Sequence, residues 1–258
     1  MCLILVAWRM HPQYPCVVAA NRDEFHERPS APAQWWADKP HILAGRDLSA
    51  GGTWLGLTRT GRIAALTNYR SAGPPRTDAP SRGRLVTGEL DSNRSVAESI
   101  AHLRHVGSEY NGFNLIFSDG ERLGVYESVT GEGRILGPGI YGLSNDVLDT
   151  PWPKVRTAKS RLIAALAELN DENALLGLLR DERAAPDAQL PDTGAGLAWE
   201  RLLSCAFILS PQYGTRSSTV VRIDGSGHVR FDEWTWSPSG DEIGRTSVSY
   251  DVEASRHQ

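Results

Sequence analysis

The chain has 258 residues, of which 40% are hydrophobic and 22% charged, and its formal net charge is −4 at pH 7. This size is typical of one domain or two, and such a chain buries enough surface to fold without disulfides. Three cysteines are too few, and odd in number, for a disulfide framework. The negative charge argues against a general nucleic-acid binder, which shows a basic footprint.

The first apolar segment, residues 2–8, is far shorter than the roughly 20 residues that a membrane-spanning helix needs. No basic region precedes it and no small-residue cleavage pattern follows it, so it does not resemble a signal peptide. We therefore expect a cytoplasmic protein with no integral membrane segment.

Strand patterns dominate the chain. Four pairs of short β-rich runs are each separated by a turn-like segment, and three of the pairs are predicted to be hairpins, which favours much antiparallel sheet. The pairs span residues 2–8 with 16–21, 53–58 with 62–69, 113–117 with 122–128, and 217–223 with 228–234.

Apolar residues recur at helical spacing in three segments, 95–106, 153–169 and 172–181. The elements do not alternate strictly between strand and helix, as they do in a parallel-sheet protein. The order favours an α+β fold, in which helices cover the faces of antiparallel sheets. Two Pro- and Gly-rich stretches, 71–83 and 183–196, are expected to be surface loops that frame a binding site.

Cys2 is the first candidate for chemistry. Aminopeptidases remove Met1 when the next residue is small, and the chain would then begin with a cysteine that carries both a thiol and a free α-amine. With a pKa of about 8, that amine accepts a proton near neutral pH, so one residue would supply both nucleophile and base. The alternative is that Cys2 is simply a small apolar residue that opens a strand.

Polar residues follow the second strand at 21–24. An arginine beside a thiol lowers its pKa, and an aspartate orients an amine. Strand alternation places Asn21 and Asp23 on one face and Arg22 on the other, so we expect Arg22 to point away from the thiol unless a bulge intervenes. A solvated, salt-bridged turn is the alternative for this segment.

Further polar groups lie at other strand ends. Asn68 and Asn145 are suitable amide donors to an oxyanion, although asparagine is also a common turn residue. Arg216 enters a strand rich in hydroxyl groups, where it would pair with a carboxylate of the protein or of a substrate. The glycines at 51–52 permit close approach of a ligand or form a tight turn.

The adjacent Trp35 and Trp36 would line an apolar pocket or else anchor the core. The sequence contains neither HExxH nor Cys-x-x-Cys, so we expect no metal site and no cofactor.

Taken together, seven segments resemble the signature blocks of the NRDE family, also called the transport and Golgi organisation protein 2 family. The blocks occur in family order and reach residue 236, so we expect one domain over residues 1–240. Residues 241–258 are expected to form a C-terminal tail that can be disordered. The blocks are MCLI at 1–4, NRDE at 21–24, GRD at 45–47, GGTW at 51–54, LTNYR at 66–70, YGLSN at 141–145 and YGTRSST at 213–219.

The resemblance implies the N-terminal nucleophile hydrolase fold, a four-layer αββα sandwich of two antiparallel sheets between helices. It also implies similarity to cysteine hydrolases that cleave linear amides, of the choloylglycine hydrolase and penicillin V acylase type. By this resemblance Cys2 matches the nucleophile and Asp23 the residue that binds its amine. Ala20 stands where those hydrolases have arginine, and Arg22 would substitute for it.

The resemblance thus implies a catalytic set and a substrate-binding set. The catalytic residues are Cys2, Arg22, Asp23, Asn68, Asn145 and Arg216. The substrate-binding residues are Trp35, Trp36, Gly52, Thr53, Trp54 and Tyr69.

The leading hypothesis is an amidohydrolase-like enzyme that cleaves a linear amide or related acyl bond through a thioester. The second is a non-catalytic carrier of an acyl, lipid, acyl-CoA or haem ligand in the same pocket, and the third is a scaffold with an inactive site. Under either the hydrolase or the carrier hypothesis, the protein binds a small acyl or amide ligand. The sequence does not indicate an oligomeric state.

Overall fold

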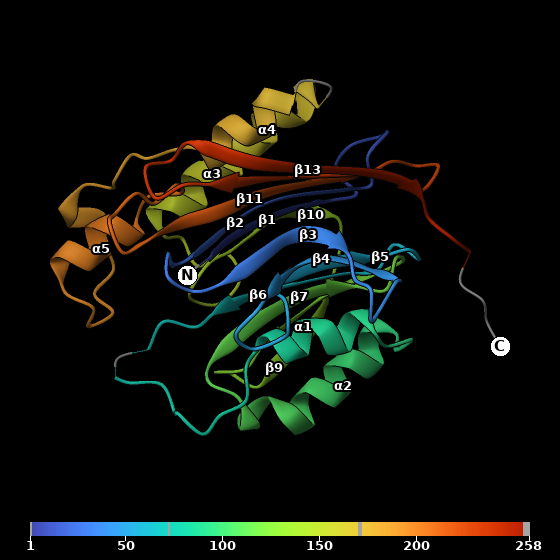
Figure 1. Cartoon of the computed structure of the whole chain (residues 1–258), viewed down its shortest axis with the longest axis horizontal. Coiled ribbons are helices and arrows are strands. Elements are labelled where there is room, and N and C mark those ends of the chain that lie inside the picture. Colours follow the sequence, from blue (N-terminus) through green and yellow to red (C-terminus); the bar gives the residue numbers. More distant parts are fainter. Residues whose placement is uncertain (1, 72, 170–171, 255–258) are drawn as a thin grey trace.

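The computed structural model describes residues 2–71, 73–169 and 172–254. Two antiparallel sheets lie face to face, with helices on both outer faces (Figure 1). The predicted α+β sandwich with four αββα layers is therefore confirmed.

The first sheet has six strands in the order β10-β1-β2-β11-β12-β13. Cys2 opens β1 at one end of this sheet, and its neighbours β2 and β10 flank it on either side. The strands are β1 (Cys2–Trp8), β2 (Cys16–Phe25), β10 (Gly139–Leu143), β11 (Tyr213–Ile223), β12 (His228–Trp236) and β13 (Glu242–Asp251).

The second sheet has seven strands that follow one another in chain order. Most of them are short and buried, and short turns connect many neighbours, as expected for a meander. They are β3 (Ser30–Trp35), β4 (Ile42–Asp47), β5 (Leu55–Thr58), β6 (Ile63–Asn68), β7 (Phe113–Ser118), β8 (Leu123–Glu127) and β9 (Glu132–Leu136).

Five α-helices lie in the described part of the chain. α1 (Gly83–Leu90) and α2 (Val96–Val106) cover the seven-stranded sheet, whereas α3 (Pro153–Ala165) and α4 (Glu172–Leu179) cover the six-stranded one (Figure 1). α5 (Leu197–Leu203) lies at one end of the sandwich. Single 3₁₀ turns occupy Gly107–Glu109, Leu166–Glu168 and Asp187–Gln189.

Local chemistry explains where two of these helices begin. The Ser95 side chain caps α2 and Glu98 returns the bond to the Ser95 backbone, which forms a capping box. Pro153 starts α3, where its missing N–H costs no hydrogen bond.

Three apolar clusters fill the spaces between the four layers. Alternation along the strands sends one set of side chains toward the other sheet and the next set toward the helices. Ile4 and Val18 belong to the cluster between the sheets, while Leu3 and Val17 pack under α3 and α4. The third cluster lies between the seven-stranded sheet and α1 and α2. Position along a strand therefore decides which layer a side chain enters.

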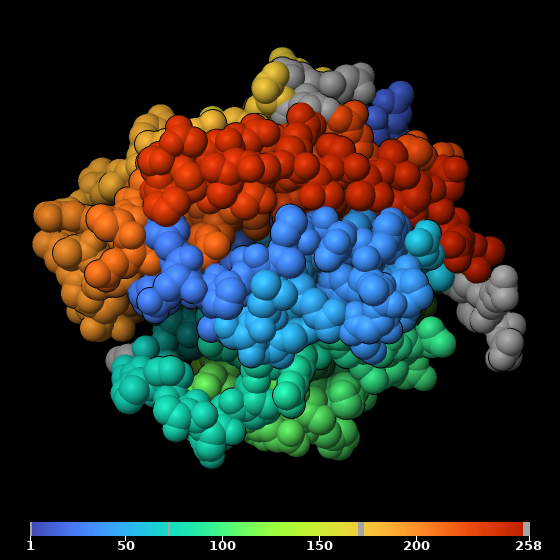
Figure 2. Space-filling model, viewed as in Figure 1, coloured from blue at the N-terminus to red at the C-terminus, as the bar shows by residue number. Residues whose placement is uncertain are grey.

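The C-terminal segment corrects the expected domain boundary. Residues 242–251, which the sequence placed in a tail, form β13, an edge strand that pairs with β12 along its length. Figure 2 shows the surface of β13 directly above that of β3 and β4. The Tyr250 hydroxyl donates to the Thr58 carbonyl oxygen at 2.9 Å and so ties β13 to the second sheet. The strand was missed because it has few apolar residues and both of its faces are partly exposed.

Candidate functional site

A cleft of about 360 Å³ lies between strands of the two sheets, beside the first residue of β1. Strand ends from both sheets and the segment that precedes α1 line it. Its wall includes Cys2, Arg22, Glu24, Asn68, Arg82, Arg216 and Glu233. Polar and charged side chains dominate this list, so the cleft is suited to a ligand with polar groups.

Cys2 lies at this cleft with only 8% of its surface exposed. Burial raises the pKa of its thiol, whereas the Asp23 backbone N–H and the Arg22 guanidinium lower it. Because burial is the largest effect, the thiol keeps its proton at neutral pH and needs a base to become a nucleophile.

The strand register corrects the prediction for Arg22. Cys2 and Arg22 are directly opposite each other in the β1–β2 pair, so both side chains lie on the same face of the sheet. That face looks toward the second sheet, because Ile4 and Ala20 on it belong to the core between the sheets. The expectation that Arg22 points away from the thiol was wrong because it considered β2 alone, without its pairing to β1.

Asp23 lies on the opposite, helix-facing side of β2. Its Oδ1 accepts a hydrogen bond from the Thr215 hydroxyl at 2.7 Å, and burial raises the pKa of its carboxyl group to about 6. The positive charges of Lys154, from α3, and of Arg22 oppose this shift. Burial in turn lowers the pKa of the Lys154 ammonium to about 8. Asp23 and Lys154 are thus two buried groups of opposite charge that attract each other behind Cys2.

A β-bulge in β11 arranges this region. Thr215 pairs with Asp23 and Ser217 pairs with Arg22, so Arg216 is an extra residue between them. The bulge lets Thr215 face the helices while Ser217 faces the cleft. The bulge that the sequence left open is therefore in β11 rather than in β2.

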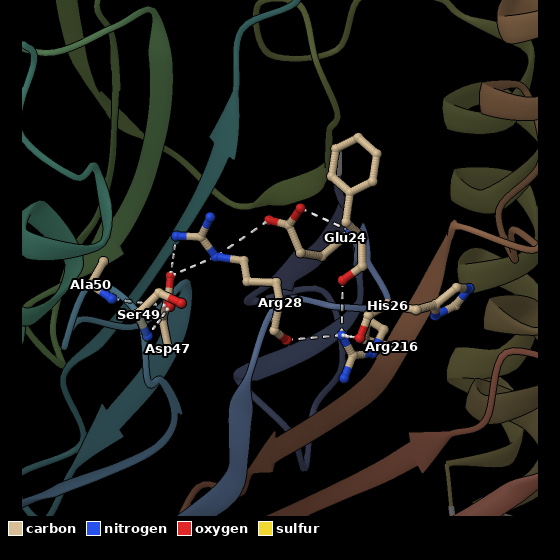
Figure 3. Close-up of polar contacts among 8 residues, drawn as sticks. Glu24, His26, Arg28, Asp47, Ser49, Ala50 and Arg216 are labelled. Atoms are coloured by element: carbon tan, nitrogen blue, oxygen red, sulfur yellow. Dashed lines mark hydrogen bonds and ion pairs between the residues drawn. The ribbon is translucent and has the colours of Figure 1, made fainter. Parts of the chain in front are cut away.

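The bulged Arg216 holds the turn that follows β2. Its Nη1 donates to the carbonyl oxygens of Phe25, His26 and Arg28 at 3.0–3.1 Å (Figure 3). Arg28 in turn binds Asp47 at 2.7 Å and lies 3.9 Å from Glu24. Arg216 lines the cleft, but its guanidinium donates to backbone oxygens of the protein, not to a carboxylate.

The two asparagines are connected but have different positions. The Asn145 amide donates to the Asn68 carbonyl oxygen at 2.8 Å, and Asn145 is buried. The Asn68 side chain reaches the cleft and makes no hydrogen bond to the described residues. Its amide donors therefore remain available to a ligand, whereas Asn145 lies behind it.

Ser144, which sequence reasoning missed, links this pair to the candidate nucleophile. Its hydroxyl lies 3.0 Å from the Cys2 carbonyl oxygen and 3.2 Å from Asn145 Oδ1, and both oxygens can accept its proton. The chain of contacts from Cys2 through Ser144 and Asn145 to Asn68 fixes the end of β1 against the end of β6. The YGLSN block at 141–145 contains both Ser144 and Asn145, but its pattern indicated a role only for the asparagine.

The expected substrate-binding residues are divided between cleft and core. Thr53 and Trp54 line the cleft, but Trp35, Trp36, Gly52 and Tyr69 do not. The Trp35 ring packs against Tyr250, with ring centroids 5.1 Å apart. Trp36 is buried and donates its indole N–H to the Ala44 carbonyl oxygen, while the backbone of Tyr69 donates to Gly112.

Lys154 and Arg82 are the other residues of this region that the sequence did not single out. Lys154 is on a helix whose pattern predicted only core packing, and Arg82 is in a Pro- and Gly-rich segment expected to be a loop. Neither residue has a local motif, and only the tertiary fold brings them near Cys2.

In the described ranges, no cluster of three or more His, Cys, Asp or Glu side chains is placed to hold a metal ion. Over the same residues, no helix combines the length and the apolar character needed to cross a membrane.

Comparison with known proteins identifies the family. The family model described as "Transport and Golgi organisation 2" matches residues 1–238. The Transport and Golgi organization protein 2 homologs of Bos taurus and Homo sapiens are each 37% identical to this chain, covering 90% of it and 92% of their own length. A solved mutant of conjugated bile acid hydrolase from Clostridium perfringens covers 98% of this chain and 97% of its own, with 10% identity and a TM-score of 0.47. From the family match and the identity to these homologs, the chain belongs to the Transport and Golgi organisation 2 family.

Proposed function

We propose that this protein is an amidohydrolase-like enzyme in which Cys2, as the first residue of the mature chain, attacks a linear amide or related acyl bond. The observation that carries the proposal is the position of the Cys2 thiol at the cleft, together with an Asn68 amide whose donors are not used by the described residues. A nucleophile and an oxyanion donor then face the same space.

In the first half of the reaction, the Cys2 α-amine takes the thiol proton and the sulfur attacks the carbonyl carbon. A carbon–sulfur bond forms and the carbonyl electron pair moves to oxygen, where the Asn68 amide stabilises the negative charge. The tetrahedral intermediate collapses and the carbon–nitrogen bond breaks. The leaving amine takes the proton from the ammonium group, and a thioester remains.

In the second half, the neutral α-amine takes a proton from water and the hydroxide attacks the thioester. The carbon–sulfur bond breaks, the carboxylic acid leaves, and the proton returns to sulfur. Asp23 is proposed to hold the ammonium form of the α-amine. With a pKa of about 6, its carboxyl group is ionised at neutral pH and can do so.

The experiment is a screen of acyl amides and acyl-CoAs by product release and thermal shift, with wild type, Cys2→Ala and Cys16→Ala. Cys16 is the matched control because it is also a buried β-strand cysteine, and burial raises its pKa to about 12. We expect hydrolysis by wild type and Cys16→Ala and none by Cys2→Ala. Intact-mass analysis of the active protein should show that Met1 is absent.

Two results would contradict the proposal. One is an active protein that retains Met1. The other is a ligand that binds wild type and Cys2→Ala equally and is hydrolysed by neither, which is the behaviour of a carrier.

A further inference from the structure

Arg22 is a cleft arginine whose guanidinium group is not bound by another side chain of the described residues. It lies on the inner face of β2, between Cys2 on one neighbouring strand and Ser217 on the other. Its guanidinium group makes no hydrogen bond and no ion pair to the described residues. Its five N–H donors therefore remain available beside the thiol.

Arg82 is the second such arginine. It lines the cleft from the segment that precedes α1, the helix that covers the seven-stranded sheet. Its Nη1 donates to the Gly112 carbonyl oxygen at 2.9 Å, which is the one hydrogen bond of its guanidinium group within the described ranges. Burial lowers the pKa of the Arg82 guanidinium, while the nearby Glu24 and Cys2 act in the opposite direction. Arg82 is thus a partly desolvated cation with no carboxylate bound to it.

The remaining arginines of the cleft are already engaged. Arg28 binds Asp47 at 2.7 Å, and Arg46 binds both carboxylate oxygens of Asp38 at 2.6 and 2.8 Å. Arg216 is held by the three carbonyl oxygens of the turn after β2. Two of the five cleft arginines are thus neutralised by aspartates and a third, Arg216, is fixed to a turn, which leaves Arg22 and Arg82 as the arginines that the protein engages least.

In the described part of the chain, no acidic side chain of the cleft forms an ion pair with these two arginines, although the charge of Arg22 acts to lower the pKa of Glu233. Glu233 accepts from the Ala33 backbone N–H at 2.7 Å and from the Thr219 hydroxyl at 3.3 Å. Burial raises the pKa of Glu233, which favours its neutral form. Glu24 accepts from the backbone N–H of Phe25 at 2.9 Å. Both carboxylates are thus held by groups other than Arg22 and Arg82.

A close backbone contact fixes the position of Arg82. Gly52 and Gly83 touch, and a Cβ atom on Gly52 would lie 2.6 Å from the Gly83 carbonyl carbon. Arg82 directly precedes Gly83 and the start of α1. Because only glycine permits this approach, the contact holds the Arg82 backbone at the cleft wall.

We propose that Arg22 and Arg82 together bind an anionic group, a carboxylate or a phosphate, carried by the substrate next to the bond that Cys2 attacks. Guanidinium groups match both anions with paired, charge-assisted hydrogen bonds. An anion would also offset the cost of the partly desolvated charge at Arg82. The position of the scissile bond rests on the proposed function, whereas the anion site itself does not.

The test measures equilibrium binding to Cys2→Ala protein, in which no turnover occurs. The probes share one acyl chain: N-octanoylglycine carries a carboxylate, N-octanoyl phosphoethanolamine a phosphate, and N-octanoylethanolamine no charge. Each is titrated by calorimetry into Cys2→Ala alone and combined with Arg22→Gln, Arg82→Gln or Arg46→Gln. Arg46 is the matched control because it is a cleft arginine already held by Asp38, and thermal melts verify the folding of each variant.

We expect at least one anionic probe to bind more tightly than the neutral probe. Arg22→Gln and Arg82→Gln should each weaken it about ten- to hundredfold, the range of a charge-assisted hydrogen bond, without changing the neutral probe. Arg46→Gln should have little effect. The preferred anionic probe identifies the group as carboxylate or phosphate.

Three results would overturn the proposal: equal binding of charged and neutral probes, equal losses in the Arg46→Gln control, or no binding of either anionic probe at millimolar concentration. The two proposals fail separately. Arginine-dependent binding without hydrolysis by wild type refutes the enzyme and retains the anion site. Hydrolysis of the neutral amide at the same rate as the anionic amides refutes the anion site and retains the enzyme.

Discussion

Replacing Asp23 by asparagine removes a buried acid whose pKa is raised from 3.8 to about 6, chiefly by burial. The folded protein therefore keeps this proton over a pH range in which the unfolded chain has already released it. Between pH 4 and 6 the folded state binds more protons, so the free energy of unfolding falls as the pH rises. The sign is opposite to that of a salt-bridged carboxylate.

The magnitude follows from the size of the shift. Each unit of pKa corresponds to about 1.4 kcal/mol, so the full effect of Asp23 is about 3 kcal/mol. About 2 kcal/mol of it falls between pH 4 and pH 6.5. Lys154, whose pKa burial lowers to about 8, stays protonated in this range and adds no slope of its own.

The assay is urea unfolding of wild type and Asp23→Asn at half-unit steps from pH 4 to 6.5. The stability of wild type relative to the variant should fall by about 2 kcal/mol across this range. Asp181→Asn is the control, because the Arg183 guanidinium lowers the pKa of Asp181 to about 2. Its curve should run parallel to that of wild type. A constant difference between wild type and Asp23→Asn would refute the reasoning.

Two further predictions concern buried polar contacts. Glu200→Gln should lower the free energy of unfolding by about 3–5 kcal/mol, because it removes the buried negative charge that faces the Arg70 guanidinium at 2.6 Å; chemical denaturation measures this. Asp187→Asn, which breaks an exposed ion pair, should leave the unfolding midpoint nearly unchanged, and an equal loss would contradict the argument. Ser144→Ala removes the hydroxyl 3.0 Å from the buried Cys2 carbonyl oxygen and should cost about 1–3 kcal/mol, whereas wild-type stability would show that this contact is unimportant.

Local sequence patterns predicted the hairpins and the layered fold because strand alternation and glycine turns act over a few residues. The 113–117 and 122–128 runs, for example, form β7 and β8 on either side of the turn-like segment predicted between them, which contains Asp119 and Gly120. β13 could not be read in this way, because it is stabilised by pairing with β12 rather than by an apolar face of its own.

The candidate site was predictable where the motif residues lie at strand ends, as for Cys2 and Asn68. The relation between Arg22 and the thiol was not, since it depends on the register of two strands. Lys154 and Arg82 reach the site through helix packing and a glycine–glycine contact over long sequence separations. No local pattern in the sequence encodes either contact.

The central claim is that the Cys2 sulfur forms a thioester with the acyl group, and trapping this intermediate tests it most directly. Wild-type protein is mixed with a hydrolysed amide, quenched in acid within one turnover, and analysed by intact-mass and peptide mass spectrometry. The account predicts the mass of the acyl group on the peptide that begins with Cys2, and no adduct on Cys2→Ala. Product release without an adduct on Cys2, or an adduct on Cys16 or Cys205 instead, would contradict it.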